Sequence, residues 1–351
     1  MKWEENVRKV VPYVAGEQPN RPNMIKLNTN ECPYPPAPGV RKAAENTESA
    51  ALRLYPNSNA QPLVDELAAY YGVKPEQVFV GVGSDDVLSM AFLTFFNSGK
   101  PILFPDVTYS FYDVWADLYR IPYHTCALDE NWHINPEDYK QPNGGVIFPN
   151  PNAPTGVEES QELIEEILQA NPDVVVIVDE AYVDFGGTSA LPLLKKYENL
   201  LVVQTFSKSR AMAGMRIGFC IGIEKLIHYL TDVKFSFNSY TMNLPSQVMG
   251  VEAVKDDAYF KATTAKIAAT RERIKKELNE LGFTFPYSKA NFIFASHKEV
   301  PAEELFRALR EADIYVRHWN KPRIANSLLR IRRIGEQAVE TPAQMRRQRH
   351  P

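Results

Sequence analysis

The stretch TFSKSRAMAGMRIGF, residues 205–219, decides the fold class, because it joins two apolar segments through a loop of small and basic residues. The run LLVVQ (200–204) comes directly before it, and GFCIG (218–222) overlaps its end. Both segments have the composition of buried strands. Lys208 and Arg216 therefore lie just beyond a strand, where ligands usually bind in an open α/β sheet. This position makes Lys208 a candidate for catalysis and not an ordinary surface lysine.

Apolar segments alternate with helical patterns on both sides of this loop. Strands are predicted at 77–83, 101–106, 144–150, 173–180, 199–206 and 218–222. Several are almost continuously hydrophobic, which indicates a sheet that is covered on both faces. Helices are predicted at 61–72, 84–99, 110–120 and 256–282. The alternation predicts an α/β fold with a mostly parallel sheet.

The two ends of the chain differ from this central pattern. The N-terminal segment is rich in proline and lacks a sustained period, which predicts an extended arm. The composition changes near 240–255, and a smaller α+β pattern follows. We therefore predict a large domain over 37–245 and a small domain over 246–351, to which the arm (1–36) also belongs.

The bulk composition excludes several classes of protein. The chain has 351 residues, a formal net charge of −4 and a pI of about 6.0, which argues against a nucleic-acid partner. Cys32, Cys126 and Cys220 form neither a disulfide framework nor a metal-ligand spacing. The first residues lack the apolar core of a secretory signal, and no apolar run approaches the roughly 20 residues of a membrane span. We expect a cytoplasmic protein without a metal or a membrane partner.

One group of side chains at the strand ends suits a phosphate. Ser84 and Asp85 open a helix directly after the strand at 77–83, where backbone N–H groups and a hydroxyl suit an anion. The alternative is an ordinary helix cap, because Ser and Asp are favoured at that position. Ser207 and Arg216 offer charge-assisted hydrogen bonds to the same anion.

A second group suits a planar ring. Asp179 ends a buried strand, where an acid is costly unless it is paired, so it serves either a salt bridge or a cationic ring nitrogen. Tyr182 offers a hydroxyl nearby, and Tyr109 offers a ring for stacking. Lys208 offers an amine that forms a Schiff base with an aldehyde. Together with the phosphate group, this set suits pyridoxal 5′-phosphate (PLP).

Eight ordered motifs carry a family resemblance: LNTNECPYPPAP (27–38), RLYPN (53–57), GVGSDDVL (81–88), TYSFY (108–112), NPNAPTG (150–156), DEAYVDF (179–185), SKSRAMAGMRIGF (207–219) and LLRI (328–331). With them the sequence resembles the fold-type I PLP-dependent enzymes of the aspartate aminotransferase superfamily, and most closely the histidinol-phosphate aminotransferase family. The resemblance implies a mostly parallel seven-stranded sheet between helices, with a smaller α+β domain.

The resemblance also implies a role for each matching position. Lys208 would bond to the cofactor aldehyde and then carry a proton between the substrate Cα and the cofactor C4′. Asp179 would keep the ring nitrogen protonated, and Tyr182 would donate to the phenolic oxygen. Tyr109 would stack on the ring. The phosphate would be surrounded by Ser84, Asp85, Ser207 and Arg216.

Other matching positions imply a partner and a substrate. Tyr55 would reach the phosphate of the partner subunit's cofactor, which implies a homodimer. Arg330 and Arg317 would bind anionic groups of the substrate, and Tyr240 is a further pocket candidate. The implied reaction is transamination between L-histidinol phosphate and 2-oxoglutarate in histidine biosynthesis, which gives imidazole acetol phosphate and glutamate.

The sequence departs from the family pattern at two places. The superfamily usually has Asn immediately before PTG, but this chain has Ala153 there, and we predict that Asn152 makes the cofactor contact instead. From Arg330 onward the chain reads RIRRIGEQAVETPAQMRRQRHP, in which Arg332 replaces a small hydroxyl residue and the periodicity of the expected helix is missing.

Alternative functions share most of these motifs. An aromatic amino acid aminotransferase or a threonine-phosphate decarboxylase would show them too, although VVPYVAGEQP (10–19) and VRHWNKPRI (316–324) favour the histidinol-phosphate family. A non-catalytic regulator is disfavoured because Lys208 is retained and no DNA-binding extension is visible. A nucleotide-binding Rossmann protein is disfavoured because GVGSDD lacks the G-x-G-x-x-G spacing.

Overall fold

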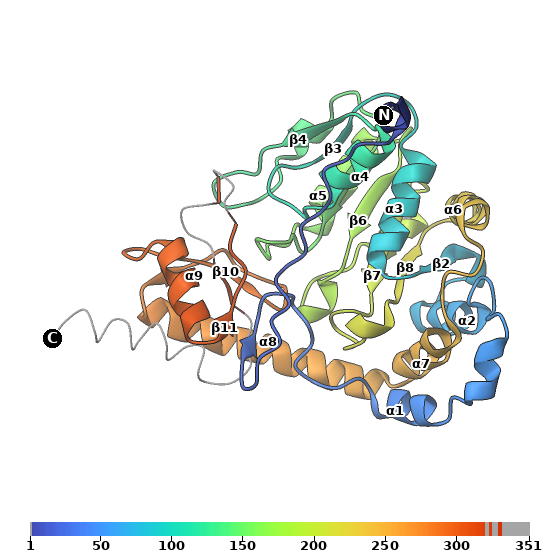
Figure 1. The fold of residues 1–351 in the computed structure, drawn as a ribbon. Helices are drawn as coiled ribbons and strands as arrows, with labels where there is room; N and C mark the ends of the chain where they lie inside the picture. The colour runs from blue at the N-terminus through green and yellow to red at the C-terminus, as the bar shows by residue number, and fades with distance from the viewer. Residues whose placement is uncertain (1, 320–322, 325–328, 332–351) are drawn as a thin grey trace.

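A seven-stranded sheet forms the centre of the molecule (Figure 1). The computed structural model describes residues 2–319, 323, 324 and 329–331, so the departures at Arg332 and beyond lie outside the described residues. The strands, in their order across the sheet, are β2 (Val78–Gly81), β8 (Gly218–Ile221), β7 (Leu200–Thr205), β6 (Val176–Asp179), β5 (Val146–Pro149), β3 (Ile102–Pro105) and β4 (Tyr123–Cys126). Adjacent strands from β7 to β4 are parallel, and β8 is antiparallel to β2 and β7. The predicted sheet is confirmed.

Helices cover both faces of this sheet because neighbouring strand residues are apolar and point to opposite sides. Ile177 packs in one core cluster, whereas Val176 and Val178 pack in another. The first cluster is covered by α3 (Ser84–Phe95), α4 (Tyr112–Tyr119) and α6 (Glu224–Phe237). The second is covered by α5 (Gln161–Ala170), and a third core lies under α1 (Pro38–Glu45), α2 (Gln61–Tyr71) and α7 (Leu244–Lys255). Short 3₁₀ helices occupy Lys2–Asn6, Ser49–Arg53, Pro75–Gln77, Pro136–Tyr139, Val183–Phe185, Leu191–Lys195 and Ala213–Met215.

The C-terminal part has its own sheet and its own core. Strands β9 (Phe283–Thr284), β10 (Ile293–His297) and β12 (Leu329–Ile331) form an antiparallel sheet in the order β12-β10-β9. This sheet packs with α9 (Ala302–Glu311) and the end of the long helix α8 (Asp257–Glu280). The predicted domain boundary after residue 245 falls inside α7, where Ala253 and Val254 pack in the core of the large sheet.

The N-terminal arm connects the two parts. Arg8 donates to the Leu118 carbonyl oxygen, and Tyr13 stacks on Phe111 with ring centroids 4.0 Å apart, so the arm runs along α4. Further on, β1 (Ile25–Lys26) pairs in parallel with β11 (Ile314–Tyr315). Figure 1 shows this path from the N-terminus past α4 to β11. The arm thereby crosses the carboxyl ends of the parallel strands.

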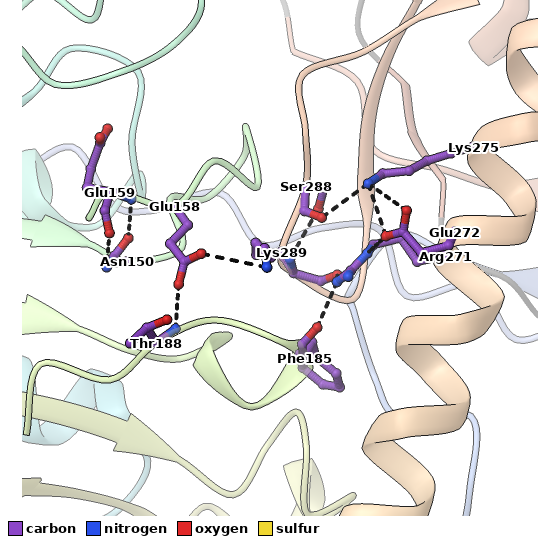
Figure 2. Close-up of polar contacts among 11 residues, drawn as sticks. Asn150, Glu158, Glu159, Phe185, Thr188, Arg271, Glu272, Lys275, Ser288 and Lys289 are labelled. Atoms are coloured by element: carbon purple, nitrogen blue, oxygen red, sulfur yellow. Dashed lines mark hydrogen bonds and ion pairs between the residues drawn. The ribbon is translucent and has the colours of Figure 1, made fainter. Parts of the chain in front are cut away.

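A polar seam joins the loops of the large sheet to α8 (Figure 2). The buried Arg271 side chain donates to the carbonyl oxygens of Phe185 and Ala290, both at 2.9 Å. Lys289 lies 3.9 Å from Glu158, and the Lys289 N–H donates to Gly156 (2.8 Å). These contacts hold the NPNAPTG loop against the C-terminal part.

Among the described residues, no helix combines the length and the apolar character that crossing a membrane requires.

Candidate active site

Two adjacent cavities, which share five lining residues, lie at the carboxyl ends of the parallel strands. The Asp179 cavity, of about 250 Å³, is lined by Ser84, Asp85, Asp179, Ser207 and Arg216, among others. The Arg317 cavity, of about 170 Å³, is lined by Tyr13, Asn28, Asn30, Arg317 and Trp319, among others. Both cavities are also lined by Thr29, Tyr109, Ala153, Tyr182 and Lys208. Most of the predicted site residues therefore surround one continuous region.

Lys208 lies at the junction of the two cavities. It follows β7, whose six residues are all buried, and its own side chain is half-buried. Its Nζ donates to the carbonyl oxygen of Thr29 (3.1 Å) and lies 5.8 Å from the centroid of the Tyr182 ring. The amine is therefore held by the N-terminal arm, at a point that a ligand in either cavity can reach.

Asp179 is the buried acid of the site. It is the last residue of β6 and is 4% exposed. Its carboxylate accepts hydrogen bonds from the Tyr112 hydroxyl (3.0 Å) and the Ala181 N–H (3.2 Å). Burial nevertheless raises the pKa of Asp179 to about 6. A cationic N–H donor in the cavity would favour the ionised form and reverse this shift.

Glycines let Arg216 approach the start of α3. This helix begins at Ser84, as predicted, and Gly83 before it has φ = +88°. A Cβ atom on Gly83 would lie 2.4 Å from Nη2 of Arg216, and a Cβ atom on Gly218 would lie 2.2 Å from the helix-start backbone. Both positions require glycine for this close packing. The free N–H groups of the helix start and a guanidinium are thus brought together, which suits a phosphate.

Asp85 orients the basic and aromatic groups around this helix start. Its carboxylate forms an ion pair with Arg216 (3.0 Å) and accepts a hydrogen bond from the Tyr109 hydroxyl (2.7 Å). Arg216 also lies 3.4 Å from the Ser207 hydroxyl oxygen. The side chains of Arg216 and Tyr109 are therefore already held in place without a ligand.

Two acids, Asp184 and the buried Glu180, brace the loops that carry Lys208 and Tyr182. The Ser209 hydroxyl donates to Asp184 (2.5 Å), which joins the two loops directly. Glu180 accepts from the Gln204 amide (2.8 Å) and from the Ala190 N–H (2.6 Å). Burial raises the pKa of Asp184, and it raises that of Glu180 to about 7.

The structure places Asn152 in the wall behind the cavities. Its amide nitrogen donates to the Val107 carbonyl oxygen (2.9 Å) and to the Thr155 hydroxyl (3.0 Å). Its amide oxygen accepts from Thr108 (3.3 Å). Ala153, and not Asn152, is the residue of this loop that lines both cavities. The cofactor contact of Asn152 stays a prediction.

The remaining predicted residues lie in different places. Arg317 lines its cavity together with Lys208. Tyr55 is 82% exposed and stacks on Tyr240, with ring centroids 4.6 Å apart, and neither lines the two cavities. Arg330 lies in β12 opposite Phe294, and its side chain lies outside the described part of the structure.

The sequence did not predict the contacts of three groups in the site: the Thr29 carbonyl, the Asn30 amide and the Tyr112 hydroxyl. Asn30 donates to the Tyr182 hydroxyl (2.8 Å), and Tyr112 donates to Asp179. All three belong to the motifs LNTNE and TYSFY. Those motifs were a usable signal for the site, but they did not indicate which atom of each residue acts.

Comparison with known proteins defines the class to which this fold and site belong. The family model for aminotransferase class I and II matches residues 22–341, and the chain belongs to this family. The chain is 52% identical over 328 residues to the histidinol-phosphate aminotransferase of Lactococcus lactis subsp. cremoris, covering 93% of this chain and 92% of that protein.

Solved structures of related enzymes share the fold. The histidinol-phosphate aminotransferase of Clostridium acetobutylicum superposes with a TM-score of 0.84 at 23% identity, covering 93% of this chain and all of that one. The enzyme from Sinorhizobium meliloti, solved in complex with pyridoxal 5′-phosphate, gives a TM-score of 0.81 at 22% identity, covering 91% and 89%.

Proposed function

We propose that this aminotransferase uses PLP to transfer an amino group from L-histidinol phosphate to 2-oxoglutarate, giving imidazole acetol phosphate and glutamate. One observation carries the proposal: Lys208, Asp179 and Arg216 converge on a single cavity at the carboxyl edge of the sheet. The high identity to a histidinol-phosphate aminotransferase over most of both chains supports the choice of substrate.

The groups that line the Asp179 cavity fit PLP. Arg216 and the N-terminus of α3 suit the phosphate, and the close packing at Gly83 gives that anion a tight cradle. Asp179 is a buried carboxylate that a protonated ring nitrogen would stabilise. Tyr182 and Lys208 line the same cavity.

In the proposed mechanism, the residues of this chain position groups and move protons. Bound PLP supplies an aldehyde that takes up the amino group and a ring that withdraws electrons from the bonds at the substrate Cα. With PLP bound, Asp179 would keep the proton on the ring nitrogen. Lys208 would move a proton between the substrate Cα and the cofactor C4′, and Tyr182 would donate to the phenolic oxygen. Tyr109 would stack on the ring.

The Arg317 cavity is the proposed substrate side of the site. Arg317 is the proposed ligand of the substrate phosphate, which an arginine binds through its planar fork. Arg317 packs on Trp319, with its guanidinium carbon 5.8 Å from the ring centroid. Arg330 is the proposed second anion ligand, and Tyr240 stays a proposed contact.

The substrate assignment is tested by turnover with 2-oxoglutarate and three amino donors: histidinol phosphate, phenylalanine and tyrosine. We expect kcat/KM to be highest for histidinol phosphate. A preference for either aromatic amino acid would contradict the proposal. Formation of carbon dioxide from a phosphorylated amino acid would instead indicate a decarboxylase.

We further propose that the enzyme is a homodimer in which Tyr55 reaches the partner's cofactor phosphate. Tyr55 is largely exposed, and it follows the exposed side chains of Leu52 and Leu54. Its stacking partner Tyr240 follows the exposed Phe237. An exposed apolar patch of this kind marks a protein contact.

Mixed dimers test this arrangement. Tyr55→Ala and Lys208→Ala subunits are each expected to be far less active than the wild type when assembled alone. Co-expressed, they should recover about a quarter of wild-type activity, because half of the random dimers are mixed and each has one complete site. Activity equal to the mean of the two variants, or a monomeric mass by light scattering, would contradict the shared site.

Domain limits and location complete the proposal. We propose that the large domain extends through α7 and that the small domain consists of the arm and the residues from α8 onward, because α7 packs in the core of the large sheet. Limited proteolysis near Asp256 tests this domain limit.

We also propose that the protein is located in the cytoplasm, which cell fractionation tests.

A further inference from the structure

Tyr55 and Tyr240 are far apart in the sequence but form a stacked pair on the surface. Their ring centroids are 4.6 Å apart, and both side chains are exposed. Each lies in a loop: residues 54–60 lead into α2, and residues 238–243 join α6 to α7. Such loops lack the regular backbone hydrogen bonds of a helix or a sheet, so other groups must fix their position.

Lys234 ties these two loops together from α6. It is 4% exposed, and its Nζ donates to the carbonyl oxygen of Ser58 and to that of Ser239 (2.7 Å). Removing an ammonium group from water is costly unless its hydrogens find acceptors, and these two carbonyl oxygens are such acceptors. The burial of Lys234 therefore depends on keeping both loops beside it.

Gln247 ties the same two loops together from α7. It is 3% exposed, and its amide nitrogen donates to the carbonyl oxygen of Asn57 (2.8 Å) and to that of Met242 (3.1 Å). Both hydrogens of the amide are thereby used. All four accepting carbonyl groups lie within three residues of Tyr55 or Tyr240.

These two bridges act on the exposed rings and not on the cavities of their own subunit. The described residues that line the Asp179 cavity and the Arg317 cavity include neither Lys234 nor Gln247. Two buried polar side chains on different helices are thus used to fix one exposed pair of rings. A surface group that is held in place before binding loses less freedom when it meets a partner.

We propose that Lys234 and Gln247 are positioning residues for the partner subunit, because they hold Tyr55 and Tyr240 where these rings reach the partner's site. The inference rests on the proposed function, in which Tyr55 completes that site. A subunit without the bridges should keep its own part of its site and supply a misplaced part to its partner. The effect of such a substitution should therefore depend on which subunit carries it.

The experiment uses mixed dimers, isolated through two different affinity tags, in which one subunit carries Lys208→Ala. Only one site of each dimer then keeps its lysine. Lys234→Met is placed either on the Lys208→Ala subunit or on the subunit that keeps Lys208. In the first placement the PLP affinity of the remaining site and its kcat/KM should each fall by about tenfold, because small displacements of positioning groups have effects of this order. In the second placement both losses should be several-fold smaller. Titration with PLP, followed by its visible absorbance, and turnover of histidinol phosphate measure them.

Two further variants and one control accompany Lys234→Met. Lys234→Arg keeps the charged donors and should recover part of the loss, and Gln247→Met should show the same dependence on placement. Lys225→Met is the matched control, because Lys225 also lies on α6 but is exposed. It should change neither the PLP affinity nor kcat/KM in either placement.

The placement separates this role from a general loss of stability. Equal losses in both placements, or no loss when Lys234→Met is on the Lys208→Ala subunit, would overturn the proposal. Tyr55→Ala tests the premise by itself and should also act mainly from the Lys208→Ala subunit. If Tyr55→Ala shows no dependence on placement, the proposed shared site is wrong, and this inference is wrong with it.

Discussion

The two cavities of the site share five lining residues and differ in the others. The Asp179 cavity is lined by residues at the ends of β6 and β7 and at the start of α3, together with four residues of the arm (Gln18, Lys26, Thr29 and Glu31). The Arg317 cavity is walled largely by the arm and by the segment after β11. The first cavity carries the groups proposed to hold the cofactor, and the second carries the groups proposed to select the substrate. Variants in the two cavities should therefore fail in different ways.

The largest effect is expected for Lys208→Ala. Removing the amine removes both the bond to the cofactor and the proton carrier, so kcat should fall on the order of 10⁴-fold or more. The loss should be the same for every donor. Single-turnover absorbance measurements with histidinol phosphate and with tyrosine check this. A loss of kcat confined to one donor would contradict the proposal that Lys208 serves the chemistry common to all donors.

Asp179→Asn should slow proton removal by about 10² to 10³-fold, because a neutral partner no longer keeps the ring nitrogen protonated.

The same change should stabilise the cofactor-free protein at high pH. Folding raises the pKa of this carboxyl from 3.8 to about 6, so the folded chain holds the proton more tightly than the unfolded chain. The stability cost is absent below pH 4, grows as the pH rises to 6, and reaches about 3 kcal/mol above that.

Urea unfolding of the cofactor-free Asp179→Asn and wild-type proteins at pH 4 and pH 8 measures this cost. We expect the variant to gain stability at pH 8 and to show no gain at pH 4. An equal difference at both pH values would show that ionisation of Asp179 is not the cause.

Arg317→Ala should act on the substrate side alone. Loss of a charge-assisted hydrogen bond should raise the KM for histidinol phosphate by about 10- to 100-fold, with a small change in kcat. Donors without a phosphate should be much less affected, and Arg317→Lys should recover part of the loss. Steady-state kinetics with donors that have and lack a phosphate tests this prediction. An equal loss for all donors would show that Arg317 acts on a step common to all of them and not on binding of the substrate phosphate.

The smallest effect is expected for Gly83→Ala. The added methyl would meet the Arg216 guanidinium, so PLP affinity should fall by about tenfold, on top of a backbone cost of about 1 kcal/mol at positive φ. Gly72→Ala is the matched control, because Gly72 also has a positive φ (67°) but has no atom within 4 Å of the added Cβ. It should lose stability and keep its PLP affinity, as equilibrium titration with PLP can measure. Equal losses of affinity would rule out the contact with Arg216 as the cause.

Sequence reasoning predicted the large sheet well, because strands that are buried on both faces appear in the sequence as continuous apolar runs. It missed β4, whose sequence is YHTC and of which only Cys126 is buried. This strand lies at the edge of the sheet, where one neighbour and partial burial are enough. It also placed the helix after Gly83 four residues too far, to 99, whereas α3 ends at Phe95.

In the site, too, residues that follow a clear sequence pattern were predicted, and those without one were not. Asp179, Lys208 and Arg216 were predictable because the ends of parallel strands share one edge of a sheet. Asn30 was not, because its contact with Tyr182 spans 152 residues and comes from an arm without a periodic pattern. The position of Asn152 depends on how the loop before Gly156 closes on itself, which its composition does not specify.

The arm also has a consequence for the order in which the enzyme is completed during synthesis. Residues 25–26 are synthesised long before their strand partner, residues 314–315. Until that partner is made, Thr29 and Asn30 lack the pairing that anchors the arm beside Lys208. A nascent chain that has already built the sheet edge therefore still lacks one wall of its pocket.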